Sequence, residues 1–221
     1  MKKFCVALFY IFLCTTFLTA CGEPEKNAAS SVKAIYDLYI LGNTDGIKSL
    51  GMSDEDIKSA QTAYDDSVRE TIRTNFSASG QEIDAATLDD LCTARKEALS
   101  RLKATAEVTS ESEGKATVTL HTTYFDEAAL DKDAFYQAKN SATSQTSLTS
   151  IEEQQAFLMA HYTQNLIDAY KNVTPSTDTN EITVACVIQD NEWVPANMSS
   201  FGADLAIAIT GPAQSADTPQ E

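Results

Sequence analysis

The sequence is poor in histidine and tryptophan and lacks the common catalytic motifs. It has two histidines, His121 and His161, and one tryptophan, Trp193, in 221 residues. It contains no G-x-S-x-G, H-E-x-x-H, P-loop or dinucleotide-binding pattern, each of which would place reactive groups at a readable spacing. We therefore expect no catalytic residues, no metal site, no cofactor and no enzymatic activity.

Positive charge is also scarce. The chain has 16 Lys and Arg residues against 32 Asp and Glu residues, a formal charge of −16. Nucleic-acid binding needs clustered basic side chains that displace counterions, and a polybasic contact with anionic lipid needs the same clusters. The composition therefore argues against a nucleic-acid partner and against electrostatic attraction to a membrane surface.

The N-terminus has the layout of a secretory signal. Lys2 and Lys3 precede residues 4–18, which are uncharged and mostly apolar. A run of about fifteen residues is shorter than the roughly twenty that span a bilayer, and small residues follow it, as at a cleavage site. We expect residues 1–20 to be a signal peptide. They hold two basic residues and no acidic ones, so the remaining chain would carry 14 basic residues and a charge of −18.

The segment Leu18-Thr19-Ala20-Cys21 resembles the lipobox of bacterial lipoproteins. The resemblance implies cleavage before Cys21, a diacylglycerol thioether on its sulfur and often a third, palmitate-like chain on the new amine. Two or more acyl chains anchor a protein stably to a membrane. We expect residues 21–27 to be a lipidated tether that holds the protein outside the cytoplasm, on the cell membrane or on an outer membrane. An ordinary signal peptide with a chance cysteine, or a membrane-spanning helix, are the alternatives.

Five cysteines are present, and two of them, Cys5 and Cys14, fall within the signal. Cys92 lies on a predicted helix and Cys186 on a predicted strand. An exported protein can form a disulfide between them, but two separate buried thiols that act as small apolar side chains fit the sequence as well. Both readings stay open.

Hydrophobic periodicity predicts helices that alternate with two hairpins. Ser53 is a predicted N-cap, and residues 140–149, rich in Ser and Thr, are a predicted loop. In the helix over 85–102, Leu88, Leu91, Cys92, Leu99 and Leu102 form the predicted inner face, whereas Arg95, Lys96 and Arg101 point outward. The predicted helices are residues 28–41, 53–76, 85–102, 126–139, 151–171 and 201–210, and the predicted hairpins are residues 104–124 and 182–195. The last helix, 201–210, could also be a strand.

Two stretches, "VKAIYDLYILGNTDGIKSL" and "ACVIQDNEWVPAN", resemble the small NTF2-like (cystatin-like α+β) lipoproteins of bacteria. The resemblance implies an α+β fold, in which a small antiparallel sheet of two hairpins packs against several helices. We expect one domain over residues 28–211 and a disordered tail over 212–221. Two predicted helices between the hairpins depart from the usual pattern of these proteins and bear on whether the usual cone-shaped pocket forms.

The residues that would line a pocket, if one exists, are His161, Tyr162, Tyr124 and Trp193. His161 falls on the predicted inner side of its helix, whereas His121 falls on the polar side of its strand. Trp193 could be a platform for a ligand, but it is better explained as a core or sheet-face residue beside a turn. The function we expect is a lipid-anchored binding or interaction module with a protein or small-molecule partner of unknown identity. An NTF2-like enzyme, which would need His161 beside a carboxylate, and a solute-binding component of a transporter are the alternatives.

Overall fold

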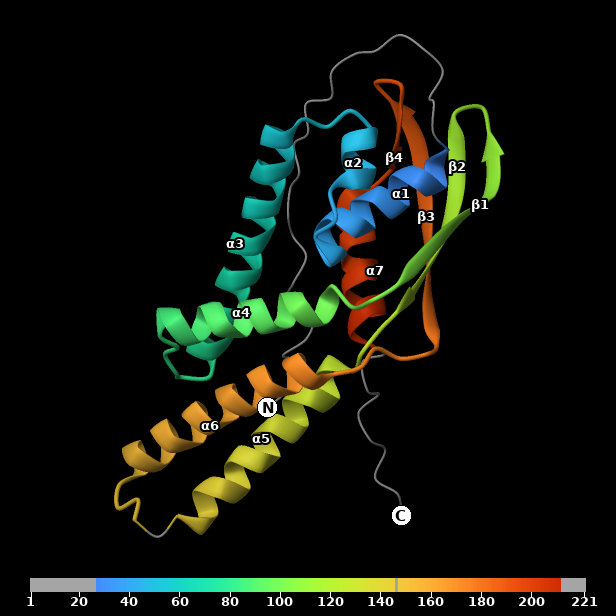
Figure 1. Ribbon diagram of the computed structural model, residues 1–221. Helices are drawn as coiled ribbons and strands as arrows, with labels where there is room; N and C mark the ends of the chain where they lie inside the picture. The colour runs from blue at the N-terminus through green and yellow to red at the C-terminus, as the bar shows by residue number, and fades with distance from the viewer. Residues whose placement is uncertain (1–26, 146, 212–221) are drawn as a thin grey trace.

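The computed structural model describes residues 27–145 and 147–211 (Figure 1). The predicted signal peptide, Cys21 with most of its tether, and the tail over 212–221 lie outside the described residues. The helices are α1 (Ala28–Tyr36), α2 (Asp45–Ser49), α3 (Asp54–Ala78), α4 (Ala85–Leu99), α5 (Glu127–Ser144), α6 (Ile151–Asn172) and α7 (Met198–Thr210), and the π-helix η1 (Asp37–Leu41) continues α1. The strands are β1 (Ala104–Ser112), β2 (Lys115–Thr123), β3 (Thr179–Gln189) and β4 (Glu192–Pro195).

The four strands form one antiparallel sheet in the order β1-β2-β3-β4. This confirms the predicted α+β class with two hairpins packed on helices. Alternate residues of β2 and β3 are buried because successive side chains of a strand point to opposite faces; the buried ones are Ala116, Val118, Leu120, Thr122, Ile182, Val184 and Cys186.

Helix α1 lies across the buried face of the sheet, and its first residues lie toward the end where β1 turns into β2 (Figure 1). The hydroxyls of Tyr36 on α1 and Thr122 on β2 are 2.8 Å apart, and both side chains are fully buried. Helix α7 packs on β3, where the side-chain amide of Asn180 donates to the carbonyl of Ala208 at 2.8 Å. The opposite face of the sheet is more open and carries His121. Its Nε2 lies 3.6 Å from Oε1 of Glu107, and its Nδ1 lies 3.4 Å from Oε1 of Glu181.

Local caps explain where the helices begin. The hydroxyl of Ser53 accepts from the backbone N–H of Asp56, which confirms the predicted cap of α3. Ser150 starts α6 with a capping box, in which its hydroxyl accepts from the N–H of Glu153 and the Glu153 carboxylate accepts from the N–H of Ser150. Such caps satisfy backbone donors that have no partner inside the helix.

The helices α5 and α6 form a hairpin between β2 and β3 that runs away from the sheet (Figure 1). Its base is fixed by Arg101, whose guanidinium donates to the carbonyls of Tyr170 and Lys171 at the C-terminus of α6. The predicted loop over 140–149 was wrong in its first half, because α5 continues to Ser144. The hydroxyls there donate to carbonyls one turn back, as Ser141 does to Gln137, and so fit within the helix.

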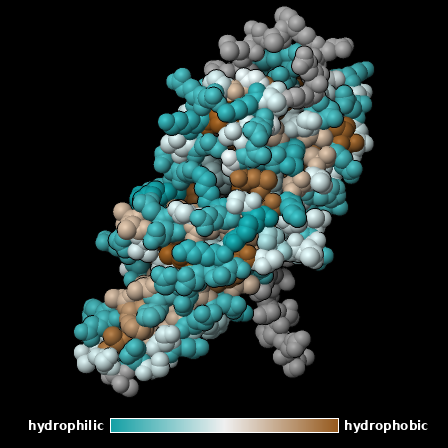
Figure 2. Space-filling view, viewed as in Figure 1, coloured by the Kyte–Doolittle hydropathy of each residue, from teal (hydrophilic) through white to brown (hydrophobic). Residues whose placement is uncertain are grey.

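Two further segments of the structure can be compared with the sequence predictions. Residues 201–210 are helical, not extended, as part of α7. Helix α2 is absent from the predicted helices. It packs closely on α1, and a Cβ at Gly46 would lie 3.0 Å from the Cβ of Ala34. Figure 2 shows that hydrophobic residues form small patches on the viewed face, among a largely hydrophilic surface.

Candidate functional site

The most unusual group in the interior is a buried arginine. Arg95 on α4 was expected to point outward, but its side chain is 7% exposed, and its Nε donates to Oε1 of Glu127 at 2.7 Å. Glu127, the first residue of α5, is 9% exposed. Arg95 falls at helical spacing from Leu91 and Leu99, inside the apolar stripe of α4, so its position in the stripe outweighs its charge. This spacing is the signal in the sequence that could have located it.

A network of phenols and carboxylates surrounds this ion pair. The hydroxyl of Tyr170 on α6 donates to Glu127 at 3.3 Å, and burial raises the pKa of Tyr170 well above its ordinary value. Burial by itself would lower the pKa of Arg95, but Glu127, Tyr170 and Tyr64 together outweigh it, and the pKa is raised. Arg95 therefore keeps its charge in the interior, where Glu127 partners it.

A second pair lies one turn further along α5. The hydroxyl of Tyr162 on α6 donates to the carboxylate of Asp131. Burial raises the pKa of Asp131, and the hydrogen bond from Tyr162 opposes part of that shift. The α5–α6 hairpin is thus joined to α4 by polar contacts in its interior as well as by apolar packing.

These groups line a small cavity, which we call the Tyr162 pocket. Its volume is about 80 Å³, and its lining comes from α3, α4, α5 and α6: Ile72, Asn75, Phe76, Leu91, Arg95, Glu127, Asp131, Tyr162, Leu166 and Tyr170. A water molecule takes about 30 Å³ of liquid volume, so the cavity has room for two or three water molecules. Five of its polar groups contact one another in hydrogen-bonded pairs, which makes the Tyr162 pocket a structural feature of the helical layer: Arg95, Glu127, Asp131, Tyr162 and Tyr170.

A larger pocket lies on the other side of Arg95, between η1, α3 and α4, and we call it the Tyr39 pocket. Its volume is about 260 Å³, close to the lower end of the roughly 300–1,000 Å³ typical of ligand sites. Its lining combines aromatic, apolar and charged side chains: Tyr39, Ile40, Tyr64, Asp65, Asp66, Val68, Arg69, Asp89, Cys92, Thr93, Arg95, Lys96 and Leu99. Arg95 lines both pockets.

The aromatic wall of the Tyr39 pocket is formed by Tyr39 and Tyr64, whose ring centroids are 5.3 Å apart. The hydroxyl of Tyr39 is buried and has no hydrogen-bond partner among the described residues, a situation that costs about 1–3 kcal/mol. Burial, followed by the nearby Tyr64, raises the pKa of Tyr39 to about 12, so the group remains a hydrogen-bond donor near neutral pH. Tyr39 belongs to η1, and π-helical turns are frequent at functional sites.

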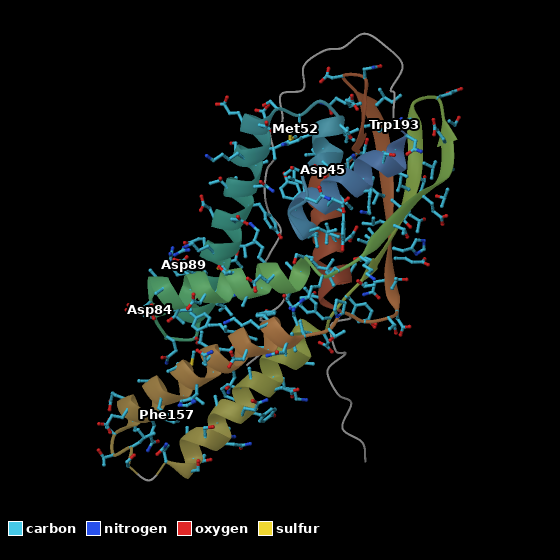
Figure 3. All side chains as sticks on the ribbon, in the orientation of Figure 1. Asp45, Met52, Asp84, Asp89, Phe157 and Trp193 are labelled. Carbon is cyan, nitrogen blue, oxygen red and sulfur yellow. The ribbon has the colours of Figure 1, made fainter. Side chains whose placement is uncertain are left out.

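The rim of the Tyr39 pocket is formed by ion pairs between α3 and α4. Arg69 pairs with Asp89, which Figure 3 places where the end of α3 approaches α4. The Nζ of Lys96 donates to Asp65 at 2.7 Å. Exposed pairs of this kind contribute at most about 1 kcal/mol each, so they orient the two helices more than they hold them together.

The structure separates the four side chains that were expected to line a pocket. Tyr162 lines the Tyr162 pocket, but His161, Tyr124 and Trp193 line neither of the two pockets. His161 is exposed, and the centroid of its ring lies 4.1 Å from that of Phe157. Its expected inward position was therefore wrong. The inner stripe of α6 follows Tyr162, Leu166 and Tyr170, and His161 lies beside that stripe. Trp193 is a residue of β4, is 4% exposed and belongs to the hydrophobic core.

Cys92 and Cys186 are both free thiols in the structure. Cys92 lines the Tyr39 pocket, and burial raises its pKa. Cys186 lies on the buried face of β3, where burial raises its pKa to about 11. Within residues 27–145 and 147–211, no cluster of three His, Cys, Asp or Glu side chains could hold a metal ion, and no helix is long and apolar enough to cross a membrane.

Fold and pockets together define an α+β protein whose helical layer encloses a buried ion pair and a mixed-charge pocket. The chain belongs to the family described as domain of unknown function DUF5105, whose profile matches residues 18–202. Its structure is similar to the crystal structure of ycdA, a candidate lipoprotein from Bacillus subtilis subsp. subtilis str. 168, with a TM-score of 0.62 and 22% sequence identity. The match covers 82% of this chain and 55% of that chain, so this chain spans about half of that protein. No curated protein matches the sequence.

Proposed function

We propose that this protein is a lipid-anchored extracytoplasmic binding module, tethered through Cys21, with the Tyr39 pocket as its ligand site. The observation that carries the anchor is the extent of the family match, which begins at Leu18. The segment Leu18-Thr19-Ala20-Cys21 therefore belongs to the region that this chain shares with its family. The similarity to a candidate lipoprotein supports the same location.

The proposal includes a division of the chain. Residues 1–20 are the signal peptide, 21–27 the lipidated tether, 28–211 the folded domain and 212–221 a disordered tail. We also propose that the sheet and its crossing helix α1 place the body among NTF2-like (cystatin-like) folds, with the α5–α6 hairpin as an insertion between the two β-hairpins. The support is the arrangement itself, since α1 crosses the buried face of one antiparallel sheet.

Binding without catalysis is the activity that the interior favours. The buried carboxylate of Glu127 is committed to Arg95 and Tyr170, and that of Asp131 to Tyr162. His161, the side chain best suited to proton transfer in an enzyme of this kind, is exposed beside Phe157. A general base needs a hydrogen-bonded partner near a bound substrate, whereas the Tyr39 pocket offers donors and charges suited to holding a ligand.

The anchor is tested by mass spectrometry of the N-terminal peptide of the full-length chain expressed in a bacterium. The expected peptide begins at Cys21 and carries a diacylglyceryl group. A Cys21→Ala variant should leave the membrane fraction, and a Cys92→Ala variant should stay in it, since Cys92 is part of the folded domain. An intact leader, or an unmodified thiol at residue 21, would overturn the proposal.

A further inference from the structure

Two groups in the lining of the Tyr39 pocket lack a protein partner, and they are of opposite kinds. The hydroxyl of Tyr39 is a buried donor with no hydrogen bond among the described residues. Asp66 is an exposed carboxylate for which the described part of the chain supplies no ion pair. A ligand that fits both must present an acceptor to the phenol and a positively charged donor to the carboxylate.

The remaining charges of the lining favour the same kind of ligand. Three cations, Arg69, Arg95 and Lys96, and three anions, Asp65, Asp66 and Asp89, face the pocket. Arg69 is paired with Asp89, Lys96 with Asp65 and Arg95 with Glu127, so Asp66 is the charge in this lining for which the described residues supply no ion pair. A ligand that carries both signs adds a carboxylate near the arginines and an ammonium near the aspartates, and it leaves the balance unchanged.

The size of the pocket limits the ligand further. A volume of about 260 Å³ corresponds to about nine water-sized volumes of roughly 30 Å³ each. The apolar part of the lining, Ile40, Val68 and Leu99 with the rings of Tyr39 and Tyr64, leaves room for a short aliphatic side chain.

We infer that the Tyr39 pocket binds a small zwitterion of the free amino acid class. The inference rests on the proposed function, since it names the ligand class of the same binding site. The ligand carboxylate accepts from the Tyr39 hydroxyl and lies near Arg69, the ammonium lies near Asp66, and the side chain contacts the apolar wall. This contact set separates amino acids from simple carboxylates and simple amines, each of which meets only half of it.

The test uses the full-length chain purified in detergent and three probes: L-alanine, acetate and methylammonium. Isothermal titration calorimetry at probe concentrations up to about 10 mM detects a Kd of about 1 mM or lower. We expect L-alanine to bind, and acetate and methylammonium to bind at least about tenfold more weakly, because each loses one charge-assisted contact. Circular dichroism confirms that each variant below is folded.

Two pocket variants have matched controls outside the pocket lining. Tyr39→Phe and Asp66→Asn should each weaken L-alanine binding by about tenfold. Tyr136→Phe, on the exposed side of α5, and Asp90→Asn, on the exposed side of α4, should leave it unchanged.

Three outcomes would overturn the inference. L-alanine could fail to bind in the stated range, acetate could bind with the same affinity as L-alanine, or the pocket variants could bind L-alanine as their controls do. Equal binding of acetate would still leave the pocket a binding site, for anions. The mass of the Cys21 peptide is measured separately, so failure of the ligand class and failure of the lipid anchor are distinguishable.

Discussion

Replacement of Arg95 by methionine tests whether the buried ion pair is the main polar determinant of the helical layer. The change leaves the Glu127 carboxylate 9% exposed, with the hydroxyl of Tyr170 at 3.3 Å as its remaining hydrogen bond. Loss of one partner of a buried pair costs about 3–5 kcal/mol, because the other charge stays buried without compensation. Against a total stability of about 5–15 kcal/mol, Arg95→Met should remove a large part of the free energy of unfolding.

The double variant Arg95→Met/Glu127→Leu separates charge from packing. It removes both charges, so we expect it to recover to within about 1–2 kcal/mol of the natural protein. The matched control is Lys96→Met, at the next residue of α4, which breaks an exposed pair with Asp65 and should cost less than about 1 kcal/mol. Urea unfolding followed by far-UV circular dichroism measures each free energy. The reasoning is refuted if Arg95→Met costs no more than Lys96→Met, or if the double variant is less stable than the single one.

Three further changes test other parts of the fold. Gly46→Ala should destabilise by about 1–3 kcal/mol despite better helix propensity, because the new Cβ meets Ala34 at 3.0 Å; equal melting temperatures would contradict this. Asp131→Asn should raise the melting temperature near neutral pH but not near pH 3, because a raised carboxyl pKa lowers stability as pH rises through it; a pH-independent effect would exclude burial as the cause. Ser150→Ala should cost about 1 kcal/mol by loss of a cap. Glu153→Gln should reduce the loss of stability on acidification, because backbone hydrogen bonds lower the Glu153 pKa and the stabilisation they give is lost as pH falls through it; an unchanged dependence of stability on acid pH would argue against the capping box.

Local rules predicted most of the secondary structure. Ser53 predicted the start of α3 as its N-cap, and hydrophobic periodicity predicted the two β-hairpins. These features depend on neighbours a few residues apart, so they are visible in the sequence. The fold class followed from the order of helices and hairpins, since an antiparallel sheet with one apolar face must be covered.

The pockets could not be predicted in the same way, because each depends on helices far apart in the chain. Arg95 was assigned outward because a charge is seldom fully buried, and its partner Glu127 is 32 residues away. His161 was assigned to the buried face of α6 because that face was predicted to be broader than the stripe of Tyr162, Leu166 and Tyr170 that is buried. The unpaired hydroxyl of Tyr39 depends on the π-helical turn that orients it, and no simple hydrophobic period marks such a turn.

The position of the first residues of α1 has a consequence for how the protein would stand on a cell. If Cys21 carries the lipid, seven residue steps join it to Ala28, and such a length cannot exceed about 25 Å. The end of the sheet with the β1–β2 turn would then lie near the bilayer, and that end carries the acids Glu111 and Glu113. Anionic headgroups would repel these acids, and the α5–α6 hairpin would extend outward, away from the lipid, as the part that other molecules of the envelope meet first.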